Sequence, residues 1–291
     1  MPIVFQPLIV AIFFVFGLAF GSFANVVIWR LPRKESLAYP SSHCTQCNHE
    51  LKSYDNIPLI SYLVLGGKCR YCKTPISVRY PIVELMSALL WAVTPFICTN
   101  LLQALTCSVF LYLLLVLSWI DFDTKTLPNK LVGLLAIIGI GGIGLSYLPP
   151  VNALNFYWVQ SYLAPQTLPF FGAARGVQAS PALAAIIGVL ATAGPAALVA
   201  WVYSLTTKKQ GFGMGDIKLL AVIGLYLGAF GALVLPMAAI IALMVIIVLS
   251  LSNRKVSLSS KIPFGPFIAL GTFVILMIGP SVWLWYMQTL L

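Results

Sequence analysis

Residues 8–29 read LIVAIFFVFGLAFGSFANVVIW, a run of 22 positions without a charged side chain. As a helix, this run is long enough to cross the hydrocarbon core of a bilayer, which is about 30 Å thick. No basic residue precedes it, and it is longer than the apolar core of a secretory signal peptide. We therefore predict a retained first membrane span.

Seven further apolar runs follow in a chain that is 60% hydrophobic and only 8% charged. A soluble domain carries roughly 25% charged residues. We expect tight turns at the Thr99-Asn100 pair and at Pro236. The runs lack strand-like alternation, so we predict an all-α polytopic membrane protein of about eight transmembrane helices. The seven further spans are expected at 82–99, 101–120, 131–148, 181–205, 217–235, 236–252 and 264–290.

The basic residues predict the orientation of these spans. The chain has 17 Lys and Arg side chains and a net charge of +10. If eight spans alternate, sixteen of these cations fall on one side of the membrane and only Arg175 falls on the other. The positive-inside rule makes the basic side cytoplasmic, with both termini outside. Topology and attraction to anionic lipid thus account for the charge, and nucleic-acid binding is not expected.

The largest polar segment, residues 31–80, contains two C-x-x-C pairs, Cys44 with Cys47 and Cys69 with Cys72. Two such pairs, with 21 residues between them, are typical of a tetrahedral site of four thiolates for zinc. Two disulfides and a redox pair are the alternatives. The expected cytoplasmic location, a reducing compartment, disfavours disulfides.

Four thiolates fill the coordination shell of zinc, so the ion is expected to be structural. The neighbouring His43 and His49 are then bystanders. Cys98 and Cys107 lie in or near spans, where we expect small buried apolar residues.

Four of the seven carboxylates lie at or in the predicted spans, where an ionisable group is a functional candidate: Glu84, Asp121, Asp123 and Asp216. Asp121 directly follows the third span, and Asp216 opens the sixth. Both are therefore expected at the cytoplasmic ends of their helices. Two close carboxylates do not both ionise easily, so such a pair can act as general base and general acid.

Less specific interpretations remain for each acid. Asp216 follows Gly215 and could be a helix N-cap. Asp121 and Asp123 could form an interfacial turn or bind a divalent cation. Glu84 could pair with Arg79 or with another basic residue.

The stretch GMGDIK at residues 213–218 resembles the GxGDxK motif of the type IV prepilin peptidases, which are bacterial inner-membrane aspartic proteases. Asp121, seven residues before Pro128-Asn129, is similar to the first catalytic aspartate of that family. Further segments resemble the opening and the cytoplasmic loop of the family, namely 21–33, 42–49, 55–61, 67–72 and 79–85.

The resemblance implies that Asp121 and Asp216 are catalytic, with Gly213, Gly215, Lys218 and Glu84 in support. The substrates would be prepilins or type II secretion pseudopilins, cut at the cytoplasmic face. Many relatives with the four-cysteine loop also methylate the new N-terminus with S-adenosylmethionine. No glycine-rich dinucleotide motif follows a strand, so the residues themselves do not place the site that binds this methyl donor. The cytoplasmic loop, with Glu84 at its edge, is a candidate for it.

The predicted organisation is a first span in residues 1–30, a zinc loop domain in 31–80 and a seven-helix domain in 81–291 that carries the peptidase site. Residues 151–179 depart from the family pattern, and 155–158 could form an interfacial anchor. The alternatives are a peptidase without methylation, a zinc-loop scaffold without chemistry and a proton-coupled transporter, for which acids near the midplane would be expected.

Overall fold

The computed structural model describes residues 7–98, 101–145, 147, 180–207, 213–251 and 263–290. These residues are almost entirely helical and contain no β-strand, only two isolated bridges. The chain divides into two compact units, Met1–Ile120 and Asp121–Leu291. Residues 151–179, which differ from the family pattern and include the possible interfacial anchor at 155–158, lie outside the described residues.

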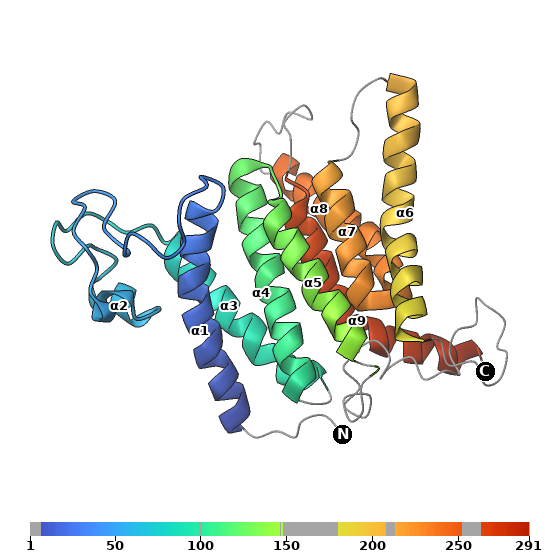
Figure 1. Ribbon diagram of the computed structural model, residues 1–291, viewed down its shortest axis with the longest axis horizontal. Helices are drawn as coiled ribbons and strands as arrows, with labels where there is room; N and C mark the ends of the chain where they lie inside the picture. Colours follow the sequence, from blue (N-terminus) through green and yellow to red (C-terminus); the bar gives the residue numbers. More distant parts are fainter. Residues whose placement is uncertain are drawn as a thin grey trace. The chain divides into compact units, whose positions relative to one another are not determined.

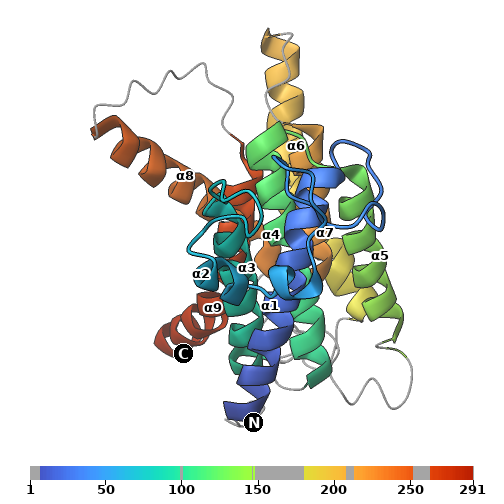
Figure 2. The ribbon, with the colours of Figure 1, turned by 90° about the vertical axis from the view of Figure 1, so that its left-hand side faces the viewer.

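In the first unit, α1 (Pro7–Arg30) packs along α3 (Arg79–Ile97), as Figures 1 and 2 show. Glycines allow this close approach. A Cβ atom on Gly17 would lie 2.6 Å from the Cα of Ala88, and one on Gly21 would lie 2.7 Å from the Cα of Glu84. Small residues at such crossings let membrane helices pack backbone against backbone.

The remaining elements of the first unit are the 3-10 turn η1 (Ser53–Asn56), the short helix α2 (Ile60–Val64) and most of α4 (Leu101–Thr124). The last turn of α4 belongs to the second unit. That unit continues with α5 (Asn129–Leu145), α6 (Pro181–Thr207), α7 (Met214–Leu227), η4 (Gly228–Leu233), α8 (Val234–Leu251) and α9 (Gly265–Leu290).

Five helical segments are long and apolar enough to cross a membrane: Pro7–Arg30, Arg79–Ile97, Leu101–Thr124, Pro181–Thr207 and Phe230–Leu251. The other three predicted spans correspond to α5, α7 and α9, of which α5 and the Gly265–Ile278 part of α9 are shorter apolar helices. The all-α, polytopic membrane class is thereby confirmed.

The predicted turn at Pro236 is wrong. Helix α7 ends earlier, at Leu227, because Gly228 adopts φ +56°, a conformation that side chains other than hydrogen disfavour. The chain then forms η4, and Pro236 lies in the first turn of α8, where its missing N–H has no helical acceptor to lose. The third span is also longer than predicted, since α4 runs on to Thr124.

Candidate functional site

Asp121 lies in the last turn of α4, and only 5% of its surface is exposed. The backbone N–H of Gly265, the first residue of α9, donates a hydrogen bond of 2.8 Å to its Oδ2. A Cβ atom on Gly265 would lie 2.8 Å from the same oxygen. The positive end of the α9 dipole can therefore approach this carboxylate only because residue 265 has no side chain.

Asp216 lies in the first turn of α7. The N-cap of that helix is Gly213, so the interpretation of Asp216 as an N-cap is wrong. A Cβ atom on Gly213 would lie 2.8 Å from Oδ2 of Asp216, and one on Gly215 would lie 3.2 Å from Cβ of Leu127. The first glycine thus leaves space at the carboxylate, and the second lets α7 pack against the segment that follows Asp121.

The second unit brings the two aspartates together. Asp216 lies within range of the charge of Asp121. Beside them, Nζ of Lys218 donates a hydrogen bond of 3.1 Å to Oδ1 of Asn129, which joins α7 to the start of α5. Asp123, by contrast, is exposed. If the two carboxyl groups come within hydrogen-bonding distance, such a pair can share one proton and activate a water between them.

Gly265 is the residue of this site that the sequence reasoning missed. A signal was present, because residues 263–266 read PFGP directly before the last apolar run. Proline is enriched in the first helical turn, so the start of a helix could have been placed there. Nothing in the sequence points from that helix start to Asp121.

The four loop cysteines form a compact cluster in the first unit. Their Sγ atoms all lie within 4.8 Å of one another, and Sγ of Cys44 is 3.8 Å from that of Cys72. Tetrahedral zinc with bonds of about 2.3 Å separates its sulfurs by about 3.8 Å. All four cysteines are free thiols, as are Cys98 and Cys107, which are buried as predicted. The cluster can thus hold a metal ion.

The two C-x-x-C segments fold alike. In the first, the N–H of Asn48 bonds to the carbonyl of Cys44, and a bridge pairs His43 with Glu50. In the second, the N–H of Lys73 bonds to the carbonyl of Cys69, and a bridge pairs Lys68 with Pro75. The hydroxyl of Thr74, 3.2 Å from Sγ of Cys72, contributes most to lowering the pKa of that thiol to about 6. A thiolate is the form that binds metal.

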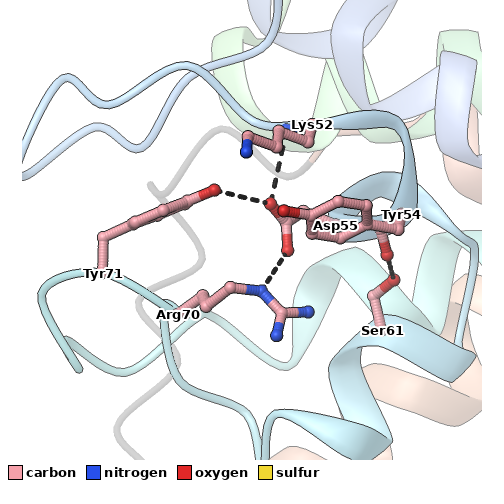
Figure 3. Close-up of polar contacts among 6 residues, drawn as sticks. All are labelled: Lys52, Tyr54, Asp55, Ser61, Arg70 and Tyr71. Atoms are coloured by element: carbon pink, nitrogen blue, oxygen red, sulfur yellow. Dashed lines mark hydrogen bonds and ion pairs between the residues drawn. The ribbon is translucent and has the colours of Figure 1, made fainter.

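A buried carboxylate ties the second C-x-x-C segment to η1, as Figure 3 shows. Oδ1 of Asp55 lies 2.7 Å from Nε of Arg70, and Oδ2 accepts bonds from the Tyr71 hydroxyl at 3.2 Å and the Lys52 N–H at 3.3 Å. Burial alone would raise the pKa of Asp55, but these donors lower it overall. Asp55 therefore has a structural role, which its position in a polar loop of the sequence did not indicate.

Glu84 is buried, and its contacts differ from the predicted pairing with a cation. Its Oε2 accepts a hydrogen bond of 2.9 Å from the backbone N–H of Leu59, and its backbone packs closely against Gly21 of α1. The guanidinium of Arg79 lies 4.9 Å from the centre of the Trp119 ring. Glu84 therefore connects α1, α3 and the turn before α2.

Two family models match the chain. The Bacterial Peptidase A24 N-terminal domain covers residues 15–97, and the Type IV leader peptidase family covers residues 108–251. No solved structure gives a significant match.

Curated relatives match over nearly the whole length. The prepilin leader peptidase/N-methyltransferase of Aeromonas salmonicida is 32% identical, over 96% of this chain and 94% of its own length. The proteins of that name from Pseudomonas putida and Neisseria gonorrhoeae are 32% and 30% identical, over 95% and 96% of this chain and 93% and 94% of their own lengths. On these matches, the chain belongs to the type IV leader peptidase family.

Proposed function

We propose that this protein cleaves the leader peptides of type IV prepilins or type II secretion pseudopilins with Asp121 and Asp216, and N-methylates the new N-terminal residue. The observation that carries the proposal is that Asp121 in the last turn of α4 and Asp216 in the first turn of α7 lie in the same compact unit, where the charge of Asp121 acts on Asp216. The names of the relatives support both activities.

In the proposed reaction, one aspartate removes a proton from a water molecule as the water oxygen attacks the carbonyl carbon of the scissile peptide. The other aspartate donates its proton to the departing amine, so the C–N bond breaks and a carboxylic acid and an amine are released. The Gly265 N–H holds the Asp121 carboxylate in position through its bond to Oδ2. Gly213 keeps the space beside Asp216 open for an extended peptide.

We further propose that zinc binds to Cys44, Cys47, Cys69 and Cys72 as a structural ion, since four thiolates leave no position for water. S-adenosylmethionine would supply the methyl group for the second activity. No group of side chains within the described ranges is assigned to that methyl donor.

The proposed setting is the bacterial inner membrane, with the zinc loop and both aspartates at the cytoplasmic face and both termini periplasmic. The distribution of basic residues supports this orientation. Residues 31–80 would form the zinc loop domain, and residues 81–291 the membrane domain with the peptidase site. A transporter would instead place its acids near the midplane.

Cleavage of a prepilin by the full chain in membranes tests the dyad. We expect Asp121→Asn and Asp216→Asn each to lower the cleavage rate by about 10³-fold or more, because each removes a proton-transfer group. Asp123→Asn is the matched control and retains substantial activity, since its side chain is exposed. Full cleavage by either dyad variant would exclude this pair of catalysts and revive the transporter or scaffold alternatives.

Methylation needs a separate readout. Purified protein incubated with prepilin and radiolabelled S-adenosylmethionine is expected to label the mature pilin at its new N-terminus. Cleavage without label would reduce the function to that of a peptidase.

A further inference from the structure

We propose that residues 57–64 of the cysteine loop, including α2, are seated among the phospholipids at the membrane surface, and that Glu84 holds them there. The occupant of this exposed apolar face is the acyl-chain boundary of the lipid that surrounds α1 and α3. The proposal goes beyond the peptidase and methylation activities and requires only that these two helices cross a membrane.

The depth of the segment follows from its contacts within the first unit. Side-chain Nδ2 of Asn25 bonds to the carbonyl of Tyr80 at 3.2 Å, which aligns α1 with the start of α3. Arg79, stacked over Trp119, is a cation-aromatic pair of the kind that marks a membrane–water boundary. Glu84 lies five residues further along α3, which is about 7.5 Å deeper at 1.5 Å per residue.

The bond from the Leu59 N–H to Glu84 brings the loop to that level. Both views of the fold show α2 beside α1 and not beyond its end (Figures 1 and 2). Apolar faces of interfacial helices typically sit about 5–10 Å into the boundary between headgroups and acyl chains. The depth given by Glu84 falls within this range.

The exposed surface of this segment is apolar. Leu63 and Val64 are 74% and 75% exposed, Ile60 is 57% exposed and Ile57 is 43% exposed. Contiguous apolar exposure of this kind marks an interaction surface. Helix α3 also exposes apolar side chains around Glu84, namely Ile82, Leu85, Met86 and Leu89. Lipid already covers a membrane helix at that depth, so lipid is the occupant that fits.

Backbone N–H groups at the start of this segment are paired within the protein, as an environment without water requires. The Leu59 N–H bonds to Glu84, the Ile60 N–H bonds to the Pro58 carbonyl at 2.6 Å, and the Ser61 N–H bonds to the Ile57 carbonyl at 3.0 Å. The Ser61 hydroxyl donates to the Tyr54 carbonyl at 2.7 Å (Figure 3). In lipid, each of these polar groups would cost several kcal/mol if it were left unpaired.

The test measures the accessibility of residue 63 to a charged reagent. Full-length Leu63→Cys and the control Ser53→Cys are placed in phospholipid nanodiscs, which expose both faces, and are reacted with a sulfonated maleimide. Peptide mass spectrometry distinguishes the new cysteine from the native ones. We expect Cys at 63 to react about tenfold or more slowly than Cys at 53, because lipid excludes the charged reagent. Equal rates would overturn the proposal.

A photoreactive benzophenone side chain at position 63 identifies what covers the segment. Adducts with phospholipid are the expected products. Adducts that form mainly with a second copy of the chain, or with added prepilin, would contradict the assignment to lipid.

The role of Glu84 is tested in the Leu63→Cys background. Glu84→Gln keeps an acceptor for the Leu59 N–H, so labelling stays slow. Glu84→Leu removes the acceptor, so labelling rises towards the rate at position 53, while bound metal reports that the cysteine cluster is still folded. Slow labelling in Glu84→Leu would show that Glu84 does not hold the segment in place.

Discussion

The cysteine cluster and the aspartate pair are assembled in opposite ways. Each half of the cluster is a local turn that closes on itself within a few residues. The aspartate site joins the ends of three helices, and the bond between Gly265 and Asp121 spans 144 positions of the chain. The first is therefore specified by short-range spacing, whereas the second exists only after the helices have packed.

The largest expected effect is the loss of metal from the cysteine cluster. Cys69→Ser removes a buried thiolate, so bound zinc should fall from about one ion per chain to none, since four ligands complete the structural site. Elemental analysis of the purified protein measures this. Cleavage should persist at a reduced rate, because the aspartates and their contacts lie in the other unit. A loss of cleavage as complete as in Asp216→Asn would show that the two regions are not separable.

The close approach at Gly265 should be the most sensitive packing contact of the aspartate site. Gly265→Val places carbon atoms against Oδ2 of Asp121 and should lower the cleavage rate by about 10²-fold, because small displacements of catalytic groups have effects of this size. Gly141→Ala is the control, since a Cβ there meets no atom within 4 Å. Metal content should be normal in both variants. Unchanged cleavage in Gly265→Val would remove this contact from the catalytic geometry.

A smaller effect is expected from the buried carboxylate of the loop. Asp55→Asn removes the negative charge opposite Arg70, and the loop should lose about 1–3 kcal/mol of stability. Faster metal release to a chelator would report it. Arg70→Gln should lower the stability of the loop by less, because 40% of the Arg70 side chain is exposed, against 2% for Asp55. The reverse order would mean that the ion pair is not what Asp55 stabilises.

The smallest effect is expected at Lys218. Lys218→Met removes the hydrogen bond to Asn129 at an exposed position. The free energy that holds the start of α7 against α5 should fall by about 0.5–1.5 kcal/mol. The cleavage rate should fall by less than in Gly265→Val. A loss as large as that of a dyad variant would indicate that Lys218 contacts the substrate directly.

Much of the fold was predictable because its signals are local. Apolar runs of sufficient length and the scarcity of charge predicted the helices, although Gly228 and not Pro236 ends α7. The C-x-x-C spacing predicted the four-cysteine cluster. The topological argument also placed Asp121 and Asp216 near one another, because both lie at helix ends expected on the same side of the membrane.

The sequence by itself determined the membrane class, the cysteine cluster and the candidate aspartates, since each depends on residue type and spacing along a few turns of chain. Only the tertiary structure decided that Gly265 meets Asp121, that Asp55 joins η1 to the second C-x-x-C segment and that Glu84 holds the turn at Leu59. These contacts arise where backbone atoms of one segment reach a side chain of another. Every residue except proline carries the same backbone N–H group. The pattern of side chains therefore does not indicate which of these groups a distant carboxylate will bind.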